Sequence, residues 1–194
     1  CALPILAYLR PIPNLVIASP LNELDLRNLM YTGYAAFNGP FVIRYPRGKG
    51  EMKDWRNEMQ VLPIGKGKKL RDGDDIAVLS IGPIGNEVIK AIEMVKEEGV
   101  SIAHYDMIYL KPLDEELLHE IGRKYNRIIT VENGVIKGGF GSAVLEFMAD
   151  NGYTPHVKRI GVPDAFIEHG SIPELYQLCG MDAESIAKQL KKEN

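Results

Sequence analysis

The stretch Ile76-Ala77-Val78-Leu79-Ser80-Ile81 decides the fold, because it is an apolar run of strand length without alternating polar side chains. A strand that is apolar on both faces is typical of a parallel sheet covered by helices on both sides. The residues that follow place apolar side chains at helical spacing, up to a break at Gly99. These side chains belong to Ile84, Val88, Ile89, Ile92 and Val95. The pattern predicts a buried strand followed by an amphipathic helix.

The same alternation of strand and helix continues to the end of the chain. Apolar runs at 100–103, 128–131 and 157–162 predict three further strands. Between them we expect a helix that begins near Asp114, a helix through Val144, Phe147 and Met148 after a glycine-rich turn, and two short final helices, the last capped by Asp182. Regular alternation of this kind predicts an α/β domain with a mostly parallel sheet.

The N-terminal segment predicts a smaller α/β unit. The apolar run 14–18 reads as a strand, and Phe41-Val42-Ile43 reads as the start of another. Between them apolar residues follow helical spacing, with Ser19 as the expected N-cap and Pro20 at the first helical position. The segment Asn38-Gly39-Pro40 should end this helix.

The amino-acid composition changes between these two units. Lys, Arg, Gly and Asp dominate, with only a short apolar patch at 61–64. Composition of this kind is typical of a linker. We therefore divide the chain into a first unit at 1–50, a linker at 51–74 and a second unit at 75–194.

Composition and charge exclude several classes of protein. The 194 residues are 45% hydrophobic and 25% charged, with a formal net charge of −3, which favours a soluble globular protein without a global attraction for nucleic acid. No apolar run approaches the roughly 20 residues that a membrane-spanning helix needs. The two cysteines, Cys1 and Cys179, lie at opposite ends of the chain and form no CxxC motif. A reduced, cytoplasmic protein is the simplest expectation.

The loop Arg44-Tyr45-Pro46-Arg47-Gly48-Lys49-Gly50 is the first candidate for chemistry. It follows a predicted strand, and ligands of open α/β sheets bind at the carboxyl ends of strands. Three cations beside glycines suit a phosphate or a carboxylate. A solvated basic loop fits the same spacing, and the spacing alone favours it.

The turn Gly138-Gly139-Phe140-Gly141-Ser142 is the second candidate, because the N–H groups at the start of a helix can bind an anion. Val144 stands where a dinucleotide fingerprint needs a third glycine or alanine, and the turn lacks the Gly-Lys-Ser/Thr ending of a P-loop. Spacing therefore favours a tight turn in which glycine relieves crowding.

Two other polar segments complete the candidates. Glu132 and Asn133 stand at a strand end, where either side chain could satisfy nearby backbone donors, and we favour this interpretation over a general base. Glu168 and His169 are adjacent, so they do not share a face of a helix or a strand, and we expect a polar loop. No histidine pair has metal-ligand spacing.

Several motifs, taken together, resemble one family of enzymes. In the first unit they are Tyr8-Leu9-Arg10-Pro11-Ile12-Pro13-Asn14, Ser19-Pro20 and Arg44-Tyr45-Pro46-Arg47-Gly48. In the second they are Tyr105-Asp106, Lys111-Pro112-Leu113-Asp114, Val131-Glu132-Asn133, Gly138-Gly139-Phe140-Gly141-Ser142 and Pro163-Asp164-Ala165-Phe166-Ile167-Glu168-His169-Gly170. In order along nearly the whole chain, they resemble the 1-deoxy-D-xylulose-5-phosphate synthases, which are transketolase-like thiamine-diphosphate enzymes. The resemblance implies the end of a pyrimidine-binding α/β domain followed by a transketolase C-terminal-type α/β domain.

The resemblance also implies an activity and one substrate residue. The family condenses pyruvate with glyceraldehyde 3-phosphate, with loss of carbon dioxide, on thiamine diphosphate held with Mg²⁺. The product feeds isoprenoid precursor, thiamine and pyridoxal synthesis. Arg47 matches the arginine that binds the phosphate of the aldehyde, and Arg44, Tyr45 and Lys49 would support it.

The resemblance places most of the active site outside this chain. The Gly-Asp-Gly…Asn stretch for Mg²⁺ and diphosphate, the activating glutamate and the Asp-Gly-x-x-His segment of the family are not in the sequence. We therefore assign no catalytic, cofactor or metal residue here. We expect the 194 residues alone to bind no thiamine diphosphate and to be inactive. The expected partners are an N-terminal region of the same protein and, as in related thiamine enzymes, a second copy in a homodimer.

Two alternatives stay open at this point. The β subunit of a 2-oxo acid dehydrogenase shares the domain order and the Lys/Arg-Pro-Leu-Asp pattern. A phosphorylated acceptor needs a fixed cation such as Arg47, whereas lipoyl transfer does not place one there. The other alternative is a non-catalytic α/β module that serves assembly or ligand sensing.

Overall fold

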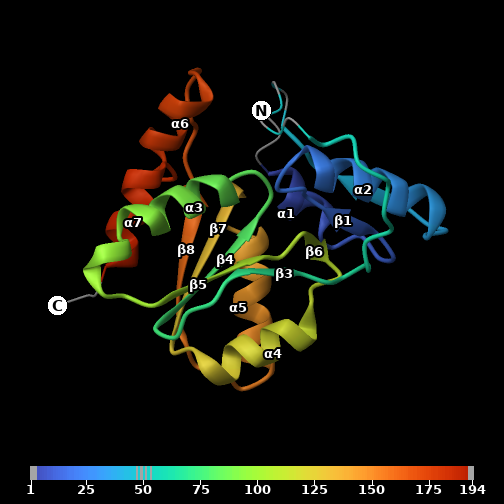
Figure 1. Cartoon of the computed structure of the whole chain (residues 1–194). Helices are drawn as coiled ribbons and strands as arrows, with labels where there is room; N and C mark the ends of the chain where they lie inside the picture. Colours follow the sequence, from blue (N-terminus) through green and yellow to red (C-terminus); the bar gives the residue numbers. More distant parts are fainter. Residues whose placement is uncertain (1–3, 47, 49, 51, 53, 192–194) are drawn as a thin grey trace.

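The structure is a computed structural model that describes residues 4–191, with the exception of 47, 49, 51 and 53. Two sheets organise it (Figure 1). No helix in the described part of the chain is long and apolar enough to cross a membrane.

The larger sheet has five strands in the order β3-β5-β4-β7-β8. Its parallel members are β4 (Ile76–Ile81), β5 (Ile102–Asp106), β7 (Arg127–Val135) and β8 (His156–Val162). Strand β3 (Lys68–Arg71) pairs antiparallel with β5 at the edge. The expected mostly parallel sheet is confirmed.

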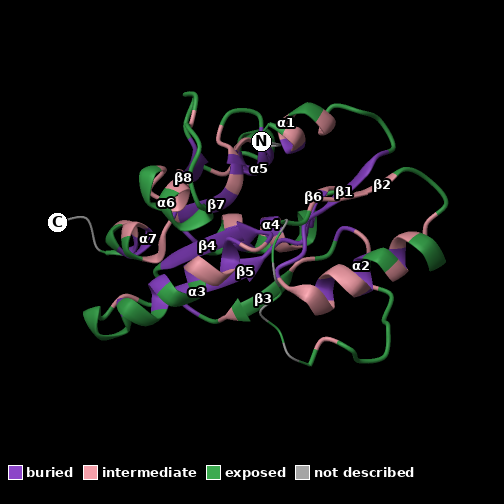
Figure 2. Ribbon diagram, turned by 90° about the horizontal axis from the view of Figure 1, so that it is seen from above, coloured by how far each residue is buried: buried purple, intermediate pink, exposed green. Residues whose placement is uncertain are grey.

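Helices cover both faces of this sheet, as the apolar strands require. Helices α3 (Gly85–Met94) and α7 (Ala183–Leu190) share a core with Ile76 and Val78 of β4. Residues of α4 (Glu115–Lys124) and α5 (Phe140–Asp150) pack with Ala77, Leu79 and Ile81 on the opposite face. Alternate residues of β4 thus enter different cores. Every residue of this strand is buried (Figure 2).

The smaller sheet has the order β2-β1-β6. Strands β1 (Val16–Ala18) and β2 (Phe41–Ile43) are parallel, and β6 (Tyr109–Lys111) pairs antiparallel with β1. Helices α1 (Ile5–Leu9) and α2 (Glu23–Ala35) flank these strands.

The two predicted units share a core. Strand β6 comes from the range 75–194 yet completes the sheet of the first unit. Leu6 and Ile17 belong to the same buried cluster as Leu79 and Leu110. Strand β3 also begins inside the expected linker. The two units therefore share a buried core and a sheet, and the boundaries at 50 and 75 stay a prediction.

The helix starts show one wrong expectation and two confirmed ones. The N-cap of α2 is Asn22, whose side chain accepts a hydrogen bond from Asp25 N at 2.9 Å. Ser19 is not a cap, because its hydroxyl donates to Arg44 O at 2.8 Å across the sheet. α4 begins next to Asp114, as predicted, with Asp114 as its N-cap, and Asp182 caps α7 as predicted.

Two further features set the ends of helices, and the sequence marked the first of them, Gly99. A 3₁₀ turn, η1 (Lys96–Glu98), follows α3, and Gly99 ends it with φ of 70°, a conformation that favours glycine. Helix α6 (Ile172–Leu178) opens with a capping box in which Ser171 and Glu174 bond reciprocally.

Candidate functional site

The basic loop begins where β2 ends, at the position that the sequence predicted. Arg44 N donates to Ala18 O at 2.8 Å, which extends the parallel pairing of β1 and β2 by one residue. The Ser19 hydroxyl donates a hydrogen bond to Arg44 O at 2.8 Å. The backbone of Arg44 is therefore fixed by two hydrogen bonds. Arg47 and Lys49, the other predicted cations of the loop, lie outside the described residues.

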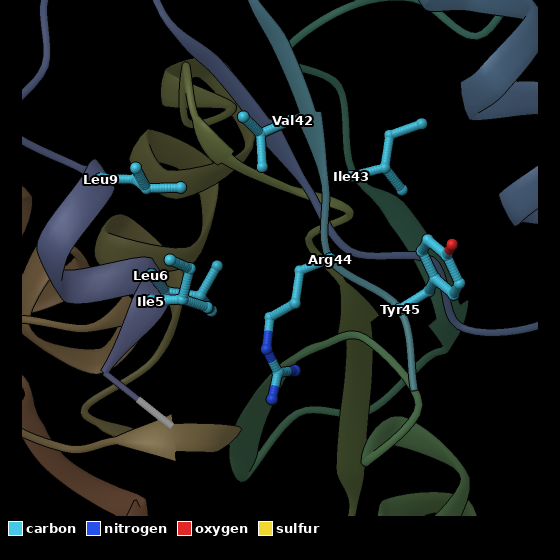
Figure 3. Close-up of a pocket in the computed structure, with 7 residues that line it drawn as sticks. All are labelled: Ile5, Leu6, Leu9, Val42, Ile43, Arg44 and Tyr45. Carbon is cyan, nitrogen blue, oxygen red and sulfur yellow. The ribbon is translucent and has the colours of Figure 1, made fainter. Parts of the chain in front are cut away.

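Side chains alternate along this strand end (Figure 3). Val42 and Arg44 point toward α1, whereas Ile43 and Tyr45 point away from it. Tyr45 is 60% exposed. The pocket beside α1 has a volume of about 190 Å³, and its lining is aliphatic apart from Arg44 and Tyr45. The pocket lining comprises Ile5, Leu6, Leu9, Val42, Ile43, Arg44 and Tyr45.

The Arg44 guanidinium binds Asn133 of β7 in the larger sheet. One terminal nitrogen donates to Asn133 Oδ1, and the other donates to Asn133 O at 3.0 Å. Burial lowers the pKa of Arg44, and the nearby Tyr176 and Glu132 oppose this shift. Two contacts to one residue fix the planar guanidinium in position. Arg44 thus joins the two sheets, and its support of a phosphate site stays a prediction.

An irregularity of β7 presents Asn133 to Arg44. The pairing between β7 and β8 is in register up to Val131 and shifts before Val135. Such bulges turn a side chain away from its regular direction and leave ladder groups free for other partners. Asn133 Nδ2 also donates to the Tyr176 hydroxyl of α6 at 3.4 Å. Asn133 therefore contacts both the start of the basic loop and α6.

The N-terminus of α5 is occupied by a carboxylate of the protein itself. Glu132 accepts hydrogen bonds from Phe140 N at 3.0 Å and from Gly141 N at 2.8 Å. Burial raises the pKa of Glu132, while the two backbone donors, Arg44 and Arg159 lower it. A carboxylate at a helix N-terminus is stabilised by the free N–H groups and the helix dipole. The anion that this turn binds is Glu132.

Both favoured interpretations of these motifs are confirmed. A Cβ atom on Gly139 would lie 2.3 Å from a Glu132 carboxylate oxygen, so the turn needs glycine for close packing. Glu132 satisfies backbone donors, as expected of a polar residue at this strand end. Glu168 and His169 lie on an exposed loop.

Within the described residues, no group of three or more His, Cys, Asp or Glu side chains could hold a metal ion. Sequence reasoning missed the role of Asn133, which meets Arg44 across 89 positions of the chain. The only signal was the strand-end position of Asn133. No local pattern could name its partner.

A comparison with known families identifies the larger part of the chain. The model of the "Transketolase, C-terminal domain" family matches residues 65–186. The chain belongs to this family. The match contains β3 to β8 and the first half of α7, so the transketolase C-terminal domain includes the whole larger sheet.

Relatives that match nearly the whole of this chain also cover the first unit. The chain is 98% identical over 189 residues to a 1-deoxy-D-xylulose-5-phosphate synthase of Parabacteroides distasonis, covering 97% of this chain and 30% of the relative. It is 62% identical to the synthase of Bacteroides thetaiotaomicron, covering 97% of this chain and 29% of that protein. The chain thus spans about three tenths of the length of these curated relatives. The predicted resemblance is confirmed, and it is supported over the 2-oxo acid dehydrogenase alternative.

A solved structure supports the arrangement of both sheets. It is titled "Split gene transketolase, inactive beta4 tetramer" and is 29% identical, with a TM-score of 0.84. The similarity covers 98% of this chain and 62% of that one. The transketolase-type fold class is confirmed.

Proposed function

We propose that the chain is the C-terminal part of a 1-deoxy-D-xylulose-5-phosphate synthase. The longer protein would condense pyruvate with glyceraldehyde 3-phosphate, release carbon dioxide and form 1-deoxy-D-xylulose 5-phosphate. Its product would feed isoprenoid precursor and thiamine synthesis in the cytoplasm. The observation that carries this proposal is the 98% identity to a synthase over 97% of the chain.

Arg47 is proposed to bind the phosphate of the aldehyde. It is three residues after Arg44, whose backbone is fixed at the carboxyl end of β2, where ligands of α/β sheets gather. An arginine binds phosphate through charge-assisted hydrogen bonds. Tyr45 and Lys49 belong to the same loop and would support the contact.

Thiamine diphosphate would supply the carbanion chemistry of the reaction, and Mg²⁺ would hold its diphosphate. The described residues do not fit this pair of ligands. They offer no cluster of acidic or histidine side chains for a metal, and the α5 N-terminus already holds Glu132. The cofactor is therefore proposed to bind to parts of the longer protein outside this chain.

The outer face of α2 is proposed to pack against that missing region of the longer protein. Met30 and Tyr34 of this face are 61% and 88% exposed. They line a groove of about 680 Å³ between α2 and the segment that carries Trp55 and Met59. Apolar patches of this kind mark interaction surfaces, and about seven tenths of the length of the relatives lies beyond the match. A homodimer of the longer protein is proposed by analogy with related thiamine enzymes.

Two measurements test the proposal. Isothermal titration of the 194-residue chain with thiamine diphosphate and Mg²⁺ should show no saturable binding, and saturable micromolar binding would contradict it. The full-length protein should form the pentulose phosphate from pyruvate and glyceraldehyde 3-phosphate only with both cofactors present. Transfer of an acyl group to a lipoyl domain instead would support the dehydrogenase alternative.

A further inference from the structure

We propose that Arg44 and Asn133 are positioning residues that hold the phosphate-binding loop against the transketolase C-terminal domain. This inference rests on the proposed function, because it concerns the same loop. It adds that the affinity for the phosphorylated aldehyde depends on a contact made by the other sheet.

Arg44 is attached through both its backbone and its guanidinium. Its backbone is bonded to β1 at Ala18 and to the Ser19 hydroxyl, both at 2.8 Å. Its guanidinium is bonded to the side chain and the carbonyl of Asn133. One residue thus fixes the start of the loop to its own sheet and to the neighbouring one.

Asn133, the partner of Arg44, is itself held in place. Asn133 lies where β7 departs from its register with β8, so its carbonyl is available to Arg44. Its amide nitrogen donates to Tyr176. The preceding residue, Glu132, is buried and bound to the first turn of α5. Asn133 is therefore held by elements on both sides, and it offers Arg44 a fixed acceptor.

The Arg44 guanidinium is engaged within the protein. Both terminal nitrogens of its guanidinium donate to Asn133, and burial lowers its pKa. A phosphate ligand that took the same two donors would have to displace these bonds. Arg44 consequently fits the role of an anchor, and the ligand contact falls to the second arginine of the motif.

The test compares variants of the full-length protein with two acceptors, glyceraldehyde 3-phosphate and unphosphorylated glyceraldehyde. Arg44→Ala removes both contacts and should raise the KM for the phosphorylated acceptor about tenfold. Asn133→Ala keeps the carbonyl and should raise it about threefold. Asn133→Asp retains a side-chain acceptor for Arg44 and should restore the wild-type KM. Pyruvate decarboxylation and the KM for glyceraldehyde should stay unchanged in all three.

A matched control separates this effect from a general loosening of the fold. Lys111 donates to Arg10 O at 3.0 Å and to Ile12 O at 2.6 Å, so it also joins β6 to the N-terminal segment, away from the loop. Lys111→Met should leave both acceptor KM values unchanged. Equal rises for both acceptors in the Arg44 and Asn133 variants, or a rise in the Lys111 variant that matches theirs, would overturn the inference.

The double variant provides a second readout. If the two residues act as one unit, Arg44→Ala with Asn133→Ala should be no worse than Arg44→Ala alone. Additive effects would contradict a shared role. Arg47→Ala distinguishes the two proposals. If it raises the KM while the Arg44 and Asn133 variants do not, this inference fails and the proposed function stands. If Arg47→Ala leaves the KM unchanged, the proposed phosphate site and this inference are both contradicted.

Discussion

Helices α2 and α3 flank different sheets and are held by opposite kinds of side chain. α3 buries Val88, Ala91 and Ile92 against the larger sheet. α2 buries a stripe that is mainly polar, with Asp25, Asn28 and Thr32 beside a single leucine. The apolar side chains Met30 and Tyr34 are instead exposed.

The polar stripe of α2 serves the segment that links the two sheets. Lys68 Nζ lies 2.6 Å from Asp25 Oδ1, Gln60 N donates to Asn28 Oδ1 at 3.0 Å, and Leu62 N donates to Thr32 Oγ1 at 2.8 Å. α3 is held by apolar packing within this chain, and its Ile89 and Met94 are 42% and 55% exposed. α2 is oriented by hydrogen bonds on one side, and its exposed apolar side is the one proposed to pack against the rest of the longer protein.

The largest effect should come from α3. Ile92→Ala leaves a cavity in the apolar core, and the free energy of unfolding should fall by about 3 kcal/mol. Urea denaturation of the 194-residue chain measures this loss. A loss below about 1 kcal/mol would show that the interior beside α3 can relax, which would weaken the contrast with α2.

The next largest effect on the free energy of unfolding should come from a change at Asp106, and it should depend on pH. Burial raises its pKa to about 7, the nearby Asp25 adds to the shift, and Lys68 and the Ile108 backbone N–H oppose it. Its Oδ2 has no hydrogen-bond partner among the described residues. In the unfolded chain it titrates near 3.8, so its cost to stability is absent below that pH, grows from there to about 7 and is complete above it.

Asp106→Asn should therefore raise the free energy of unfolding by about 2 kcal/mol at pH 8 and by almost nothing at pH 4. Urea denaturation at both pH values measures it. Asp150→Asn, a change at an exposed carboxyl, serves as the control. Equal effects of Asp106→Asn at the two pH values would refute the titration argument.

A smaller loss is expected from the polar stripe of α2. Thr32→Val preserves the shape of the side chain but leaves Leu62 N without its acceptor, which should cost about 1 kcal/mol. Hydrogen exchange at the Leu62 amide should accelerate in parallel. Unchanged protection of this amide would show that the hydroxyl does not hold the linking segment.

The smallest effect in this chain should come from the outer face of α2. Met30→Glu should change the free energy of unfolding by less than about 0.5 kcal/mol, because the side chain is exposed. The same change in the full-length protein should lower its stability measurably if the missing region covers this face. Equal insensitivity of both proteins would remove α2 from the proposed interface.

The sequence predicted the larger sheet better than the contacts between the sheets. Runs such as 76–81 are long and apolar, which predicts a strand of a parallel sheet that is buried on both faces. Strands β3 and β6 were missed because each is short and takes its place from pairing with distant residues. Ser19 carries the residue type of a cap, and only tertiary structure shows that its hydroxyl binds Arg44 instead.

In the candidate site too, local contacts could be predicted from the sequence and contacts between the sheets could not. The role of Glu132 could be predicted, because its donors follow within nine positions of the chain. The contact between Arg44 and Asn133 could not, because it depends on how two sheets approach each other. Arg47 was singled out by resemblance to a family, and its role stays a prediction.

The proposed function depends most on Arg47, which is expected to bind the phosphate of the aldehyde acceptor. The most direct measurement is the KM for glyceraldehyde 3-phosphate in Arg47→Ala of the full-length protein, together with the rate of pyruvate decarboxylation. Loss of a charge-assisted phosphate contact should cost about 1.5–3 kcal/mol, which corresponds to a rise in KM of about ten- to a hundredfold, with decarboxylation unchanged. An unchanged KM, or equal damage to both steps, would contradict the assignment.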